Sequence, residues 1–141
     1  MTTKFFFCAT CGNVVVNVAD SGVSPFCCGQ EMKELVPMTT ETMAEKHLPE
    51  IHLKEKDNTL LVKVGALPHP MTPDHHIRFI YLETENGGQI RYLDPAKPAE
   101  ACFCLGKEVP VAVYAYCNIH GLWKTDVKCE AKPDRKCCKR F

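Results

Sequence analysis

The chain has 141 residues with 17 basic and 17 acidic side chains, so its formal net charge is zero and it has no electrostatic footprint for nucleic acid. Its hydrophobic content of 45% is ordinary for a globular protein, and no apolar run approaches the roughly 18 residues of a membrane span. The three Phe after Lys4 are far too short a run for a signal-peptide core. We therefore expect a cytoplasmic protein with neither nucleic-acid nor membrane partners.

The first segment, 1–37, carries four of the ten Cys as a Cys-x2-Cys pair and an adjacent pair, at Cys8, Cys11, Cys27 and Cys28. In a reducing compartment, clustered Cys more often bind metal than form disulfides, although a disulfide or unpaired buried Cys is the simpler reading. A module of this size, with one short strand expected at 13–18, usually needs a cross-link to be stable, and a bound metal is the natural one here. Four sulfurs suit iron or zinc equally, and the adjacent pair should strain the local backbone.

The second segment, 38–128, begins with a linker up to residue 42 and then consists mainly of short strands. We expect strands at 60–64, 75–83, 89–92, 101–105, 109–117 and 122–128, with a hairpin turn at Asn86-Gly87-Gly88. Short strands separated by turns favour an antiparallel sandwich or barrel. A single helical turn at 43–46 is the most helix that we expect here. The remaining residues, 129–141, include three Cys and five basic residues without apolar periodicity, which is typical of a mobile extension.

Four of the six His, together with one Cys, are candidates for a second metal site. Cys117-x2-His120 offers a thiolate and an imidazole from one turn, and Cys117 shares its strand parity with apolar residues. His69 lies between two Pro residues, which restrict the backbone of its loop. A buried free thiol and ordinary packed or surface His are the simpler readings of these residues.

His75 is separated from its neighbour by strand parity. His75 shares a face with Ile77, Phe79 and Tyr81 and should point inward, whereas His76 should point the other way. His52 follows His47 by five residues without a supporting motif, so we interpret it as a surface residue.

These segments resemble the desulfoferrodoxins, the two-iron class of superoxide reductase. The resemblance covers about 1–128 and rests on CATCG, CCGQEM, EKHLPEI, VGALPHPM, the His75 that follows, and YCNIHGLW. It implies a desulforedoxin-like module over 1–37 and an immunoglobulin-like β-sandwich over 38–128. The first would hold iron, or zinc as a substitute, in an Fe(Cys)4 site made by Cys8, Cys11, Cys27 and Cys28. The second would hold iron in an Fe(His)4Cys site, with His47, His69, His75 and His120 in a plane and Cys117 axial.

The resemblance also implies the one-electron reduction of superoxide to hydrogen peroxide without dioxygen release, at a site whose five protein ligands leave one position open. A rubredoxin-like protein would be the electron donor of a cytoplasmic homodimer. Lys46 would steer the anion and help to deliver a proton, and Glu45 would be able to occupy the open position in the ferric state. An ordinary solvated Lys and an exposed surface Glu are the simpler readings of these two residues.

Five Cys match no family ligand: Cys102, Cys104, Cys129, Cys137 and Cys138. We expect packed thiols for the first two and exposed thiols for the other three, with a redox or metal role as the alternative for the latter. Three other functions stay open, namely a superoxide dismutase, a non-catalytic two-iron electron-transfer protein and a zinc-stapled binding module.

Overall fold

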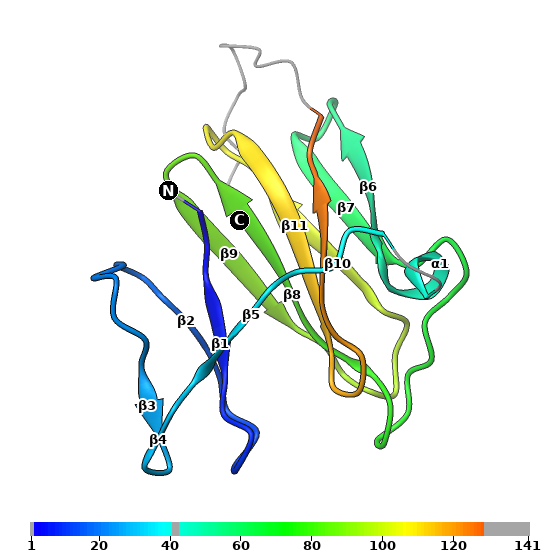
Figure 1. The fold of residues 1–141 in the computed structure, drawn as a ribbon. Coiled ribbons are helices and arrows are strands. Elements are labelled where there is room, and N and C mark those ends of the chain that lie inside the picture. Colours follow the sequence, from blue (N-terminus) through cyan, green and yellow to red (C-terminus); the bar gives the residue numbers. More distant parts are fainter. Residues whose placement is uncertain (1, 41–42, 129–141) are drawn as a thin grey trace. The chain divides into compact units, whose positions relative to one another are not determined.

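The computed structural model describes residues 2–40 and 43–128 of the chain (Figure 1). It consists of two compact units, the first ending at Val36 and the second beginning at Pro37. The segment 129–141, for which a mobile extension and exposed thiols were predicted, lies outside the described residues. Within the described ranges, no helix has the length and hydrophobicity that a bilayer span requires.

The first unit is a small β structure with very little core. Its three-stranded antiparallel sheet has the order β2-β1-β5, and its other two strands form a separate hairpin. The strands are β1 (Phe5–Phe7), β2 (Val14–Val16), β3 (Phe26–Cys27), β4 (Gln30–Glu31) and β5 (Lys33–Leu35). Phe6, Cys8 and Met32 form its buried cluster, with Cys27 packed against them. A core of this size contributes little stability, so a bound metal or another cross-link would stabilise the unit substantially.

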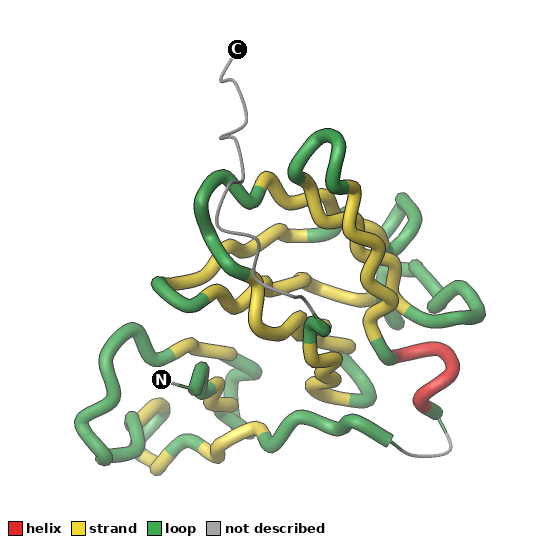
Figure 2. The backbone as a smooth tube through the Cα atoms, turned by 90° about the horizontal axis from the view of Figure 1, so that it is seen from above, coloured by secondary structure: helices red, strands yellow, loops and turns green. Residues whose placement is uncertain are grey.

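The second unit is a sandwich of two antiparallel sheets, with orders β10-β7-β6 and β12-β11-β8-β9. Its elements are α1 (Ala44–His47), β6 (Pro49–Lys54), β7 (Thr59–Val64), β8 (Ile77–Thr84), β9 (Gly87–Tyr92), β10 (Glu100–Cys104), β11 (Pro110–Cys117) and β12 (Gly121–Asp126). The single turn of α1 is the one helix in the described part of the chain (Figure 2). The predicted mainly β, antiparallel fold is confirmed.

The core of the second unit lies between the two sheets. Buried side chains from β7, β8, β10 and β11 make one cluster, which includes Leu60, Val62, Ile80, Leu82, Phe103 and Val113. Strand β6 was not predicted, although Ile51 and Leu53 alternate with polar residues and pack against this cluster. The alternation is the signal that reveals an amphipathic edge strand.

A β-bulge changes the parity on which the prediction for His75 rested. Ile77 pairs with Cys117 but Phe79 pairs with Tyr116, so the register shifts between them. Ile77 consequently joins the core, whereas Phe79 stacks on Tyr116 outside it. The predicted face shared by His75, Ile77, Phe79 and Tyr81 was therefore wrong, because an extra residue in one strand reverses the alternation beyond it.

The expected hairpin turn at Asn86-Gly87-Gly88 was wrong in detail. Thr84 pairs with Gly87, so the turn consists of residues 85 and 86, and Gly87 and Gly88 belong to β9. A side chain on Gly88 would collide with the ring of Tyr81, so a larger residue at this position would require the Tyr81 side chain to move.

Cys102 and Cys104 are exposed free thiols rather than packed ones. Ala101 and Phe103 face the core from β10, so the alternation of the strand turns both Cys residues outward.

Candidate metal centres

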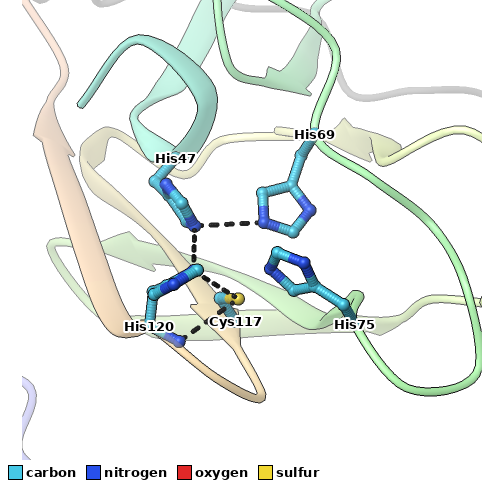
Figure 3. A group of neighbouring side chains, drawn as sticks. All are labelled: His47, His69, His75, Cys117 and His120. Carbon is cyan, nitrogen blue, oxygen red and sulfur yellow. Dashed lines mark hydrogen bonds between the residues drawn. The ribbon is translucent and has the colours of Figure 1, made fainter. Parts of the chain in front are cut away.

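Five side chains from three separated regions converge in the second unit (Figure 3). We call this set the His4Cys group: His47, His69, His75, Cys117 and His120. One nitrogen or sulfur atom from each residue lies within 4.8 Å of the corresponding atom of every other. The structure therefore brings together all five residues proposed for the second site.

His47 is the last residue of α1 and is almost fully buried. Its Nδ1 lies 2.8 Å from the carbonyl oxygen of Met43, to which it donates in the tautomer that leaves Nε2 free. The ring also stacks on the indole of Trp123, with centroids 4.7 Å apart and planes inclined by 21°. Trp123 was not singled out from the sequence, because its contact with His47 depends on the packing of β12 beside α1.

His69 lies in the loop that follows β7. Its Nδ1 is 2.6 Å from the carbonyl oxygen of Pro70, which fixes the tautomer and again directs Nε2 toward the group. Gly65 begins this loop with a φ of +87°, and a Cβ there would meet the carbonyl groups of Lys46 and Leu67 at 2.6 Å or less. Glycine at this position therefore lets the loop lie directly against α1.

Cys117 is the last residue of β11, and His120 ends the tight turn that leads from it into β12. The backbone N–H of His120 donates to Cys117 Sγ at 3.4 Å, and this sulfur belongs to a fully buried residue. Gly121 has a φ of +81° and starts β12 immediately after His120. The turn thus aims both side chains at one point from a single hairpin.

His75 precedes β8 in a loop without regular structure. Its Nε2 is buried and has no hydrogen-bond partner, although the ring makes edge contacts with His69 and His120. An unpaired buried nitrogen costs free energy unless something binds it. Its position inside the His4Cys group makes a cation the natural partner.

The spacing of the nitrogen atoms fits ligands that share one ion. His47 Nε2 lies 3.1 Å from His69 Nε2 and 3.1 Å from His120 Nδ1. Two nitrogens at right angles around one metal, each bound at about 2.1 Å, would be about 3.0 Å apart. With the Nδ1 protons of His47 and His69 donated to carbonyls, their facing lone pairs would repel one another without a cation between them.

Burial favours the neutral form of three of these imidazoles, those of His47, His69 and His75. It lowers the pKa of His69 to about 4, against the opposing effect of the Pro70 carbonyl, and it also lowers the pKa values of His47 and His75. Neutral imidazole is the form that binds a metal. At neutral pH, protons therefore compete less for these three imidazoles than for exposed ones.

The other candidate residues lie at the edge of the group or outside it. Glu45 and Lys46 are both exposed on α1, immediately before His47. Burial is the largest cause of the lowered pKa of His47 and His75, and the neighbouring imidazoles come next. The charge of Lys46 contributes less, but it lowers both pKa values, so its field reaches the group. His52 lies on β6 as an exposed partner of Glu50, and it is not part of the group.

The first unit contains a second set, the four-thiol group, made of Cys8, Cys11, Cys27 and Cys28. Cys11 Sγ is 3.5 Å from Cys27 Sγ, which is 3.9 Å from Cys28 Sγ. Sulfurs bound at about 2.3 Å in a tetrahedron would be about 3.8 Å apart, so these separations fit a single ion. Cys28 has a φ of +53°, the strained backbone that an adjacent Cys pair was expected to produce.

The sulfurs of the four-thiol group influence one another strongly. Hydrogen bonds from the backbone of Cys11 and Thr10 lower the pKa of Cys8 to about 6. Hydrogen bonding to the sulfurs of Cys11, Cys27 and Cys8 raises the pKa of Cys28 to about 12. Four thiolates do not coexist here without a cation, so the set is chemically suited to a metal. The two groups together fit the two metal sites of a desulfoferrodoxin.

Comparison with known proteins gives consistent matches. The model of the Desulfoferrodoxin family matches residues 39–126. A desulfoferrodoxin from Desulfarculus baarsii is 38% identical over 124 residues, which are 87% of this chain and 95% of that protein. A superoxide reductase from Pyrococcus abyssi is 35% identical over 102 residues, covering 61% of this chain and 89% of that protein.

A solved structure extends the similarity to the arrangement of the chain. The crystal structure of the superoxide reductase from Treponema pallidum superposes with a TM-score of 0.77 at 28% identity, covering 89% of this chain and 98% of that one. Both the sequence similarity and the structural similarity span most of the chain, and the matched region contains the His4Cys group. The chain therefore belongs to the desulfoferrodoxin family.

Proposed function

We propose that this protein is a superoxide reductase, which reduces superoxide by one electron to hydrogen peroxide without releasing dioxygen. The observation that carries the proposal is the His4Cys group, in which four imidazoles and one thiolate meet at one point. Membership of the desulfoferrodoxin family and the similarity to named superoxide reductases support it.

The donor sets support iron as the metal of both sites. In this proposal, Cys8, Cys11, Cys27 and Cys28 hold the first iron, for which zinc is a possible substitute. The second iron is held by His47, His69, His75, His120 and Cys117. Five donors exceed the four of a structural zinc site and are one fewer than an octahedral ion accepts, which leaves room for a small anion. Bound iron would supply the electron that converts superoxide and two protons to hydrogen peroxide.

The protein's own residues prepare the site for an anionic substrate. An imidazole binds a metal in its neutral form, so Cys117 would be the one anionic ligand of the group and a divalent ion would keep a net positive charge there. Lys46 adds a second positive charge beside His47, where it attracts superoxide and supplies a proton through water. We assign Glu45, its exposed neighbour, the role of a ligand in the oxidised state.

The Cys117 thiolate is the electron-rich ligand of the set. The N–H of His120 donates to its sulfur, and full burial excludes water from it. A Cys thiolate donates electron density to the metal in haem enzymes, and Cys117 would donate to a bound iron in the same way and so support its one-electron reduction of superoxide.

A rubredoxin-like protein is proposed as the donor that restores the reduced state. The small unit then has the desulforedoxin-like role of a second redox centre, and the larger unit is the reductase domain. We further propose a homodimer in the cytoplasm.

The decisive experiment measures the products and the metal content together. The protein is purified without oxygen, its iron and zinc are counted, and superoxide is delivered by pulse radiolysis. We expect two irons per chain and one peroxide per superoxide consumed, with no dioxygen. Dioxygen release at half the superoxide consumed would indicate a dismutase, and two zincs per chain would indicate a binding module.

One further measurement addresses the electron-transfer alternative. A saturated second site would not accept an external ligand, whereas a site with five protein ligands should bind azide or cyanide when oxidised. A shift of the visible spectrum on adding azide is therefore expected, and an unchanged spectrum would favour a non-catalytic electron carrier.

A further inference from the structure

The ring of His75 is held in a different way from the rings of His47 and His69. Nδ1 of His47 and Nδ1 of His69 each donate to a backbone carbonyl, and these bonds hold the two rings. His75 has an unpaired Nε2 and lies in an irregular loop before β8. Its place in the group must therefore come largely from the backbone on either side of it.

Within its own loop, the backbone of His75 is bound to Thr72. The His75 N–H donates to Thr72 Oγ1 at 3.1 Å, and the Thr72 N–H donates to the His75 carbonyl at 3.0 Å. These bonds shape the loop internally. They do not position it relative to Cys117 and His120, which lie more than 40 residues later in the sequence.

Asn118 makes that long-range connection. Its Oδ1 accepts the His76 N–H at 2.9 Å, and its Nδ2 donates to the Asp74 carbonyl at 2.9 Å. The Asn118 N–H also donates to the His76 carbonyl at 3.2 Å. One side chain therefore bonds to the peptide groups on both sides of His75.

Because of the position of Asn118, these bonds tie the loop that carries His75 to the turn beside Cys117 and His120. It directly follows Cys117 and lies two residues before His120, on the turn that supplies both of those ligands. A shift of the 72–76 loop would break two side-chain bonds, so the loop and the turn hold one geometry. An Asn is well suited to this bridge because its amide presents one acceptor and one donor in a plane.

We propose that Asn118 is a positioning residue of the second metal site, which sets the location of His75 relative to Cys117 and His120. The proposal rests on the proposed function only in taking these residues as ligands of one metal. Residues that orient metal ligands through hydrogen bonds typically contribute about 10- to 100-fold to metal affinity. Removing the Asn118 amide should therefore weaken metal binding at the His4Cys group without disturbing the four-thiol group.

The test compares Asn118→Ala with Gln89→Ala. Gln89 is a matched control, because its side-chain amide also donates to a backbone carbonyl, that of Cys104, at 2.9 Å. It pairs with Leu82, five residues along β8 from Ile77, and so lies far from the group. Asn118→Asp is the second variant, since it keeps the acceptor for the His76 N–H but loses the donor to Asp74.

Two measurements are made on the full chain without superoxide. Anaerobic competition of Fe²⁺ with a chelator gives the affinity of each group, and hydrogen exchange of the protein with both groups saturated by Fe²⁺ gives the protection of the His76 amide. For Asn118→Ala we expect about 10- to 100-fold weaker Fe²⁺ binding at the His4Cys group and faster exchange at His76. Fe²⁺ binding at the four-thiol group and in Gln89→Ala should stay within twofold of the parent.

Asn118→Asp should retain protection at His76 and show an intermediate loss of affinity. If Asn118→Ala does not fold, this variant alone decides the matter, because it preserves half of the bridge. The proposal is overturned if Asn118→Ala, or Asn118→Asp in its place, binds Fe²⁺ at the His4Cys group within twofold of Gln89→Ala. It is also overturned if both metal groups weaken equally, which would indicate a general loss of stability. Neither readout depends on peroxide production, so a failure of the proposed reaction would be seen separately.

Discussion

Trp123 offers a quantitative test of how the core supports the second site. It is the one Trp of the chain, it is 0% exposed, and it stacks on His47. Its Nε1 is buried without a hydrogen-bond partner. The residue therefore combines a large apolar contact with an unpaired donor, and two substitutions separate these contributions.

Trp123→Ala removes the whole ring and should lower the free energy of unfolding by about 3–5 kcal/mol. Trp123→Phe keeps an aromatic ring against His47 and loses the burial of two carbons, about 1.6 kcal/mol. It also removes the unpaired N–H, whose burial costs about 1–3 kcal/mol. These two contributions nearly cancel, so we expect Phe to change stability by no more than about 1 kcal/mol.

Urea unfolding followed by far-UV circular dichroism measures both variants, since neither retains Trp fluorescence. With a denaturant dependence of about 1–3 kcal/mol per molar urea, a loss of 3 kcal/mol moves the midpoint by about 1–3 M. The visible spectrum of the iron-loaded second site should be preserved in Trp123→Phe and altered in Trp123→Ala. An Ala variant within 1 kcal/mol of the parent, or a Phe variant as unstable as Ala, would refute the reasoning.

Three further predictions concern charge and the first unit. In pulse radiolysis, Lys46→Ala should capture superoxide more slowly and with a weaker dependence on salt, while its iron stays bound. Lys107→Ala removes the same charge from the loop before β11 and should change neither the rate nor its salt dependence. Cys28→Ser should abolish the first metal site in metal analysis yet leave peroxide production, and loss of peroxide from a folded variant with a loaded second site would show instead that the first site is an essential relay. Lys4 pairs with Asp20 at 2.8 Å, and their hydrogen bond lowers the pKa of Asp20 below 3.8 and raises that of Lys4 above 10.5. The pair should therefore stabilise the first unit between these pH limits, and only weakly because it is exposed. This stabilisation should be lost as acid protonates Asp20 or as alkali deprotonates Lys4. Unfolding that is equally acid-sensitive in the parent and in Asp20→Asn would contradict the prediction.

The composition and spacing of the chain determined which residues are chemically able to bind metal. Cys8-x2-Cys11 and Cys117-x2-His120 each supply two donors from one turn, which is a local property that sequence displays directly. Alternating apolar residues likewise indicated most strands of the sandwich, because strand periodicity is local too.

Tertiary structure decided what depends on contacts between distant segments. The inward position of His75 came from no simple alternation, since a bulge in β8 shifts the register and His75 precedes the strand. Three contacts join residues that are far apart in the chain. His120 turns its Nδ1 toward His47, Trp123 stacks on His47, and Asn118 bridges to the 72–76 loop. Such contacts are set by how the hairpins pack together, and a pattern within any one segment carries no record of them.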